Sequence, residues 1–447
     1  MAQGVLPKEP GRFLTGNLKE ILDNPLLFLS EKYAINNEIS RSKAGPIDVY
    51  NVGNPDLIKT ILTDKKIEKA RLNRKLFYPV IGNGLLASEG ELWKQQRRSI
   101  SSIFRPKKVV NLQQQMIEPS EKLAEKLADS GKVNLTEAAT LVTIQILVRT
   151  IFGLQHDFPI RNLDENLSIL ADQFVKRVSS VIQIPLWIPT KQNRTLNDST
   201  TQVLEIVQSL IDEHDKIPDE LNQNSLITAL RSAEDENANK MSTKQIFDEV
   251  ATFFLAGHEA TSTTLQWAVF NLSRHTEKQK NLQMELDTVL GDCPPQKDDF
   301  DKLPYLKAVV DETLRLFPTC YVQTREVAHK DYELNGIKLK KGSLIAIPVY
   351  AIHRNPKWYR NPDDFLPERW LDSSLSELPK LAYMPFGGGK RVCIGEHFSR
   401  FELMTLLSII YQKTQSNIIE NETAPNIFPA VTLRPDKDMY VAFRKRS

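Results

Sequence analysis

The sequence predicts a mainly helical α+β protein with small β-sheets, and its hydrophobic patterning supports this prediction. From about residue 90 onward, apolar residues recur with a helical period, which is interrupted by proline-bearing loops at 185–189 and 294–304. Strand-like patterns occur in residues 12–65, where short helices also occur, and in residues 325–350. A long and mostly apolar helix between these segments is the third observation that favours a helical body.

The strand segments are bounded by residues typical of turns. Asp48–Val52 is predicted to be a strand that ends at a Gly53-Asn54-Pro55 turn. In the second segment, Tyr332–Gly336 has the composition of a hairpin turn, and Leu344–Val349 is an apolar run. No internal repeat or shift in composition marks a linker between domains.

The long helix is predicted to begin at a capping box, Ser242-Thr243-Lys244-Gln245, and to run to about His275. Its centre is apolar on most faces, which is typical of a buried helix, and its acidic and polar residues argue against a membrane span. Gly257 in its interior costs about 1 kcal/mol relative to alanine. We therefore expect a neighbour to need the space beside this glycine.

Composition restricts the classes of function. A hydrophobic content of 41% allows a sizeable core, and a net charge of +2 predicts no nucleic-acid partner. The three cysteines, Cys293, Cys320 and Cys393, suggest no disulfide framework, which favours a reducing compartment such as the cytoplasm. Met1–Gly11 has no apolar stretch, so we expect neither a signal peptide nor a membrane anchor.

The segment from Phe386 to Gly395 carries the most specific chemistry. Its glycine run delivers Cys393 to the start of a predicted helix, Glu396–Tyr411, whose backbone N–H groups would favour the thiolate. A lone thiolate as the fifth ligand of haem iron favours cleavage of the O–O bond of dioxygen. Arg391 is placed to meet a carboxylate of the same cofactor, and Gly395 permits a close backbone approach.

Two other interpretations of this segment are weaker. The glycines before Lys390 could form a phosphate-binding nest, but the serine or threonine that follows the lysine in such loops is absent. Cys393 and His397 have helical i, i+4 spacing and could share a zinc ion. Structural zinc usually takes four ligands from paired cysteines, and the sequence has no such cluster.

The segment resembles the haem-ligand loop of the cytochrome P-450 superfamily, Phe-x-x-Gly-x-Arg-x-Cys-x-Gly. It matches that pattern at Phe386, Gly389, Arg391, Cys393 and Gly395. The resemblance implies the cytochrome P-450 fold, with a long central helix over haem b, and a soluble member of the bacterial type.

The resemblance also bears on domain organisation, because length alone would suggest two or three domains. It implies one haem domain over residues 1–447, with a β-rich N-terminal lobe at about 12–65 and a helical body at about 90–447. No Gly-x-Gly-x-x-Gly unit or fused reductase is found. A separate ferredoxin or flavodoxin with its reductase is therefore expected to supply electrons.

Within the long helix, Ala256–Thr261 resembles the family's Ala-Gly-x-Glu/Asp-Thr segment on the oxygen-binding side of the haem. Glu259 matches the family's acid, which with Thr261 or water would deliver protons. Ala260 stands where most members carry threonine, and Thr261 lies about 100° further around the helix. A local widening of the helix, of the π-bulge kind, could turn Thr261 toward the position of the missing threonine. Otherwise a water or a substrate hydroxyl must help to deliver protons.

Two further groups of residues resemble family motifs. Glu312 and Arg315 match Glu-x-x-Arg and, with Arg369, would form a structural lock that is not catalytic. Trp93 and Arg97, one helical turn apart, would reach the haem propionates together with Arg325. Taken alone, the Trp93–Arg97 pattern equally suits an amphipathic surface helix.

Basic residues at Arg97-Arg98 and at Arg105-Pro106-Lys107-Lys108 could receive an acidic electron-transfer protein, although a plain solvated face is an alternative. The segments that correspond to pocket walls in the family are apolar, which suits a lipophilic substrate such as a fatty acid or a terpenoid. They are 76–81, 85–86, 181–188, 253–254, 319–322 and 428–431.

These observations predict a haem-thiolate monooxygenase that inserts one oxygen atom of dioxygen into a C–H or C=C bond of a lipophilic molecule. Ala260 favours an alternative within the enzymes, namely one that uses peroxide or that catalyses oxidative coupling or rearrangement. A haem- or lipid-binding module without catalytic activity is the alternative outside the enzymes. The intact Glu259 and thiolate loop argue against it.

Overall fold

The computed structural model describes residues 11–12, 15–31, 38–159, 163–179, 184–218, 222–234, 238–420 and 422–446. The chain separates into two compact units, Met1–Arg74 with Asp311–Cys393 (the first unit) and Lys75–Val310 with Ile394–Ser447 (the second unit). Almost all of the N-terminal segment in which we expected no anchor lies outside the described residues. Within the described part of the chain, no helix has both the length and the apolar character needed to cross a bilayer.

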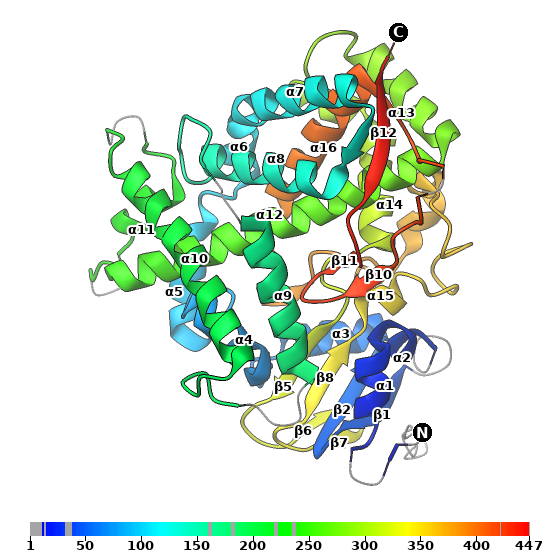
Figure 1. Ribbon diagram of the computed structural model, residues 1–447. Helices are drawn as coiled ribbons and strands as arrows, with labels where there is room; N and C mark the ends of the chain where they lie inside the picture. Colours follow the sequence, from blue (N-terminus) through cyan, green and yellow to red (C-terminus); the bar gives the residue numbers. More distant parts are fainter. Residues whose placement is uncertain are drawn as a thin grey trace. The chain divides into compact units, whose positions relative to one another are not determined.

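The first unit contains the larger sheet, whose strands follow the order β1-β2-β8-β5-β3 (Figure 1). The β1–β2, β5–β8 and β3–β5 pairs are antiparallel, whereas β2 and β8 are parallel. The elements of this unit are α1 (Leu18–Asp23), α2 (Pro25–Glu31), β1 (Ile39–Ala44), β2 (Ile47–Val52), α3 (Pro55–Thr63), β3 (Ile67–Lys69), β5 (Gln323–Val327), β6 (Tyr332–Leu334), β7 (Ile337–Leu339), β8 (Leu344–Ile347), α15 (Val349–Ile352) and the 3-10 turns Pro367–Trp370, Ser373–Glu377 and Gly389–Arg391.

The predicted strands occur where the sequence placed them. The Asp48–Val52 segment lies in β2. The apolar run Leu344–Val349 forms β8 and the start of α15. The predicted hairpin joins β6 to β7 through Asn335 and Gly336, which have φ angles of 48° and 77°. Two successive positive φ angles are those of the turn that best fits strand twist, and this explains the Asn-Gly pair.

The second unit is mostly helical and carries the long helix α12 (Thr243–Arg274), which packs against α8 and α16 (Figure 1). Two small sheets complete it, β4-β12-β9 and the β10–β11 hairpin. Its other elements are α5 (Gly90–Ser101), α6 (Pro106–Val109), α7 (Gln113–Ser130), β4 (Lys132–Asn134), α8 (Leu135–Thr150), α9 (Leu163–Ser179), α10 (Lys191–His214), α11 (Leu226–Ser232), α13 (Thr276–Val289), α16 (Glu396–Lys413), β9 (Thr414–Asn417), β10 (Ile427–Pro429), β11 (Leu433–Pro435), β12 (Tyr440–Lys445) and the 3-10 turns Val110–Leu112 and Lys297–Lys302.

The chain passes from one unit to the other within α4 (Arg71–Ile81), within α14 (Pro304–Leu316) and between Cys393 and Ile394. The mainly α fold with small sheets is confirmed. The single haem domain stays a prediction, and the β-rich region at 12–65 belongs to a unit that also includes Asp311–Cys393.

Helix α12 begins as predicted but uses its cap differently. The Ser242 hydroxyl accepts a hydrogen bond from the backbone N–H of Gln245. The Gln245 side chain donates to the carbonyl oxygen of Asn83 and to the carboxylate of Glu249. The cap therefore also helps to attach the loop before α5 to the helix.

Two adjacent carboxylates on α12 fix that loop, which spans residues 82–88. The backbone N–H of Asn83 donates to Asp248, and that of Leu85 donates to Glu249, both at 2.9 Å. The contact is tight, because a Cβ added at Gly84 would lie 1.9 Å from the Thr252 hydroxyl oxygen. Burial raises the pKa of Glu249 to about 8, against the opposing effect of its hydrogen bonds.

This raised pKa makes a prediction about stability. Between about pH 4.5 and about pH 8 the folded protein binds more protons at Glu249 than the unfolded protein does. The contribution of this group to the free energy of unfolding therefore decreases as the pH rises through that range. We expect Glu249→Gln to flatten this decline in urea unfolding experiments, because glutamine keeps an acceptor for Leu85 and does not titrate.

Glu205 on α10 is exposed, and Glu205→Gln is the matched control. It should reproduce the pH dependence of the unchanged protein. A Glu249→Gln variant whose unfolding free energy declines as steeply as that of the control would contradict the prediction.

Candidate active site

The cysteine loop of the first unit is closed by its own backbone. The N–H of Cys393 donates to the carbonyl oxygen of Phe386 at 2.9 Å, so the loop returns on itself just before α16. Cys393 is exposed, and helix α16 begins three residues later with Gly395 as its N-cap. Gly395 has a φ of −88°, so its backbone requires no glycine, and its predicted closeness to haem stays a prediction.

Two glycines determine the shape of this loop, Gly389 of the matched pattern and Gly387, which the sequence did not mark. Gly387 and Gly389 have φ angles of 75° and 65°, which side chains rarely adopt. A Cβ at Gly389 would lie 2.4 Å from the carbonyl oxygen of Leu62, and one at Gly387 would lie 2.7 Å from the side-chain nitrogen of Gln323. The loop therefore rests directly on α3 and β5, and this contact fixes the backbone that presents Cys393.

The predicted propionate ligands lie in both units. Arg325 is on β5, where its guanidinium donates to the Thr324 carbonyl and to the Gln323 side chain, and Arg391 is in the 3-10 turn of the cysteine loop. The Gln323 side chain, to which Arg325 donates, also lies against Gly387 of the loop that carries Arg391 and Cys393. Trp93 and Arg97 lie one turn apart on α5 of the second unit, and both are half-buried.

Glu259 on α12 has a partner that the sequence argument missed. The Thr432 hydroxyl, in the turn between β10 and β11, donates to a Glu259 carboxylate oxygen at 2.7 Å. Burial raises the pKa of Glu259, whereas this hydrogen bond and the charge of Arg434 act in the opposite direction. A threonine within a short hairpin far along the chain gives no local signal that could have identified it.

The Thr261 side chain contacts α16 and does not take the place of the threonine missing at Ala260. It is buried, and its hydroxyl lies 3.1 Å from the Ser399 hydroxyl on α16. The buried carboxyl of Glu402 lies beside it, with a pKa that burial raises well above the usual range. Helix α12 is α-helical along its whole, fully described length, so the widening that could have moved Thr261 is absent.

The other residues of this helical segment mainly serve packing. A Cβ at Gly257 would lie 2.9 Å from Leu147 on α8, so the neighbour that needs the space is another helix. His258 is buried and donates from Nδ1 to the carbonyl oxygen of Phe254. Burial lowers its pKa to about 4, which leaves the ring neutral near pH 7.

The apolar segments predicted to line a pocket are partly core. Phe254 is fully buried, and the Phe253 ring stacks on Phe104 with centroids 5.3 Å apart. The Phe77 ring stacks on Phe174 of α9 at 4.9 Å. Residues 181–183 of another predicted wall lie outside the described residues.

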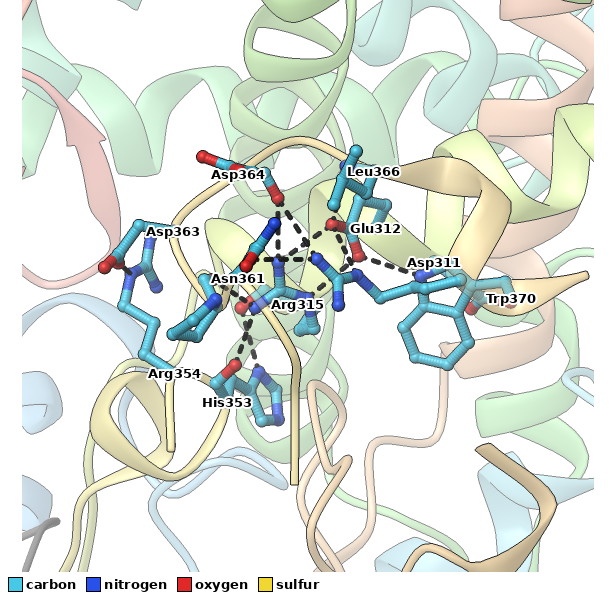
Figure 2. Close-up of polar contacts among 12 residues, drawn as sticks. Asp311, Glu312, Arg315, His353, Arg354, Asn361, Asp363, Asp364, Leu366 and Trp370 are labelled. Atoms are coloured by element: carbon cyan, nitrogen blue, oxygen red, sulfur yellow. Dashed lines mark hydrogen bonds and ion pairs between the residues drawn. The ribbon is translucent and has the colours of Figure 1, made fainter. Parts of the chain in front are cut away.

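Glu312 and Arg315 lie together in the first unit (Figure 2), and Arg369 forms an ion pair with the same Glu312 carboxylate. Glu312 and Arg315 are fully buried and form two parallel hydrogen bonds of 2.8 Å. The Arg369 Nε donates to the same carboxylate at 3.0 Å, as do the indole of Trp370 and the backbone N–H of Leu366, both at 2.9 Å. Five donors thus satisfy one buried carboxylate.

Arg315 is satisfied as completely as its partner. Its remaining N–H groups donate to the carbonyl oxygens of His353 and Pro362 at 2.7 Å and of Asp364 at 3.2 Å. His353 accepts from the backbone N–H of Met384 at 2.9 Å, two residues before the cysteine loop begins. Burial and the charge of Arg315 lower the pKa of His353 to about 3. The ring is therefore neutral, and its Nε2 can accept the hydrogen bond from Met384.

Comparison with known proteins identifies the family. Residues 7–442 match the family model described as cytochrome P-450. Cyclooctatin synthase of Streptomyces melanosporofaciens is 28% identical over 420 residues, which cover 92% of this chain and 88% of the relative. Cyclooctat-9-en-7-ol 5-monooxygenase of the same organism is 27% identical, with coverages of 89% and 86%. Human cytochrome P-450 4V2 is 27% identical, with coverages of 90% and 81%.

The chain belongs to the cytochrome P-450 family, since the family model spans nearly all of it. It is a haem-thiolate monooxygenase, which uses dioxygen and electrons from a redox partner. The residues fit this cofactor: Cys393 is exposed at the end of a loop with a fixed backbone, and Arg325 and Arg391 belong to the same unit. Among the described residues, no group of three histidine, cysteine or acidic side chains offers a competing metal site.

We expect the buried cluster around Glu312 to be essential for folding. Arg315→Ala would leave the Glu312 carboxylate buried without its main cation, so the free energy of unfolding should fall by about 3–5 kcal/mol. Urea unfolding and the yield of haem-loaded protein measure this effect.

The matched control is Asp363→Asn in the same cluster. Asp363 is 80% exposed and pairs with Arg354 at 3.2 Å, so its loss should cost less than about 1 kcal/mol. An Arg315→Ala protein that unfolds at the same urea concentration as this control would show that the pair is dispensable.

Proposed function

We propose that this protein binds haem b through the Cys393 thiolate and inserts one oxygen atom into a lipophilic, terpenoid-like or fatty-acid-like substrate. The observation that carries the proposal is the loop from Phe386 to Cys393. Gly387 and Gly389 of this loop have φ angles that other residues rarely adopt, and its single cysteine is exposed. When bound, the haem supplies the activation of dioxygen.

Arginine side chains are the proposed partners of the haem carboxylates. Arg391 and Arg325 contribute from the first unit, and Arg97 contributes from α5 together with the indole N–H of Trp93. Arginine is suited to this task because its planar guanidinium forms paired hydrogen bonds with a carboxylate. About three positive charges for two propionates is a reasonable balance for partly buried carboxylates.

Glu259 is the proposed acid for proton delivery. Its pKa is raised by burial, and a raised pKa brings a carboxyl group closer to the range in which it can both take up and release a proton at neutral pH. Thr261 is the weaker candidate, because its hydroxyl is engaged with Ser399 on α16. Ala260 provides no hydroxyl, so the acid must find a hydrogen-bonding partner elsewhere.

The relatives support the choice of substrate class. One of them acts, by its name, on cyclooctat-9-en-7-ol, an unsaturated alcohol. The apolar composition of the predicted wall segments suits ligands of this kind. We infer that a terpenoid alcohol is a better first probe than a fatty acid.

Electrons are proposed to come from a separate ferredoxin or flavodoxin with its reductase, and the protein to be cytoplasmic. Arg105, Lys107 and Lys108 on and next to α6 are exposed and offer positive charge to an acidic partner. Charge pairs of this type accelerate encounter more than they strengthen binding.

The iron ligand can be tested with the protein's own cysteines. Cys393→Ser should abolish the thiolate-type Soret band of the reduced, carbon-monoxide-bound protein, because a hydroxyl cannot replace the thiolate. Cys293→Ser and Cys320→Ser are matched controls, since both cysteines are also exposed, and they should keep the band. A thiolate-type band that survives in Cys393→Ser refutes the assignment.

The substrate class can be tested by titration of the ferric protein. A cyclic terpenoid alcohol that displaces solvent near the iron should shift its spin state at micromolar concentration, roughly −8 kcal/mol of binding free energy. A long-chain fatty acid serves as the comparison. A spin shift with the fatty acid alone would move the proposal to fatty-acid hydroxylation, and no shift with either would remove both classes.

A further inference from the structure

The hairpin β10–β11 places a threonine hydroxyl against the acid of α12. The turn is tight, because the N–H of Ala430 donates to the carbonyl oxygens of Phe428 and Thr432 at 3.0 and 3.1 Å. Thr432 is the last residue of this turn, and its hydroxyl donates to Glu259 at 2.7 Å. The geometry of the turn thus fixes the direction from which Glu259 receives its hydrogen bond.

A cation follows two residues later in the same hairpin. The Arg434 guanidinium pairs with Asp172 on α9 at 3.0 Å and lies over the Phe428 ring at 5.7 Å. Its charge also acts on Glu259. Since the Asp172 side chain is 51% exposed, the Arg434–Asp172 ion pair lies at the surface of this unit.

The two nearer candidates for a hydroxyl partner are excluded by position. Residue 260, next to the acid, is alanine and has no hydroxyl. The Thr261 hydroxyl is buried and lies 3.1 Å from Ser399. Thr432 is therefore the hydroxyl that reaches the Glu259 carboxylate.

Attachment of the hairpin does not by itself require this hydroxyl. The indole N–H of Trp267, on the same helix, donates to the carbonyl oxygen of Leu433 at 3.4 Å. Leu433 is fully buried, so its side chain also holds β11 in place. The Thr432 hydroxyl is thus available for a role beyond attachment.

We propose that Thr432 is a positioning residue for Glu259, and that the hairpin supplies the hydroxyl partner that α12 does not provide. The proposal rests on the proposed role of Glu259 in proton delivery. The hydroxyl holds the carboxylate in one orientation and favours its charged form, and Arg434 reinforces that preference from the side of Asp172. No bond is made or broken by Thr432.

Thr432→Val tests the proposal, because valine keeps the shape of threonine and removes the hydroxyl. Infrared difference spectra between each protein and its Glu259→Gln counterpart follow the titration of this one carboxyl group in the resting protein, without turnover. Loss of a hydrogen bond to the charged form should move the titration to higher pH by about one pH unit. The fraction of electrons recovered in product should fall about tenfold, because the acid is no longer held in place.

Two variants control for indirect effects. Thr432→Ser keeps the hydroxyl and should restore both the titration and the yield of product per electron. Thr423→Val removes an exposed threonine shortly before β10 and should change neither. A titration of Glu259 that is the same in Thr432→Val as in the unchanged protein would overturn the inference, as would Thr432→Ser behaving like Thr432→Val.

Failure of the proposed function would look different. If Glu259→Gln itself left the yield of product per electron unchanged, Glu259 would not be the proton-delivering acid, and the premise would fall. If Glu259→Gln lowered the yield of product per electron while Thr432→Val did not, the role of Glu259 in proton delivery would be retained. The positioning role of Thr432 would be refuted.

Discussion

The buried ion pair between Glu312 and Arg315 is the interaction on which the first unit depends. Burial of two charges is unfavourable unless every remaining donor and acceptor is satisfied. Here the carboxylate accepts five hydrogen bonds, and the guanidinium donates to three carbonyl oxygens besides its partner. Those carbonyls come from residues 353–364, so the pair fixes a long segment without regular secondary structure.

The same cluster connects to the cysteine loop by a short series of contacts. The His353 carbonyl accepts from Arg315, and its ring accepts from the backbone of Met384. Met384 in turn accepts from the N–H of Gly387, where the loop turns with a positive φ. A buried charge pair on α14 is thus linked through these contacts to the loop that ends at Cys393, and this explains why a residue pattern on α14 belongs with a cysteine far along the chain.

The sequence was sufficient where the signal is local. The Ser242 cap, the Asn335-Gly336 turn and the apolar period of α12 each express the physics of a few neighbouring residues. The sequence was insufficient for contacts that only the fold creates. The family pattern marked Gly389 but not Gly387, and neither the contact of Gly389 with Leu62 nor that of Gly387 with Gln323 could be predicted from the sequence.

The polar residues of α12 show the same limit and suggest how the helix works. On a mostly apolar buried helix, each polar group needs a partner from another element. Glu249 binds the loop before α5, Thr261 meets Ser399 on α16, and Glu259 meets Thr432 of the hairpin. The sequence marks these residues as exceptions to the apolar pattern, but their partners lie up to 173 positions away. Each of these three polar exceptions therefore attaches α12 to one neighbouring element, and the acid beside Ala260 has its hydroxyl partner in the β10–β11 hairpin and not on its own helix.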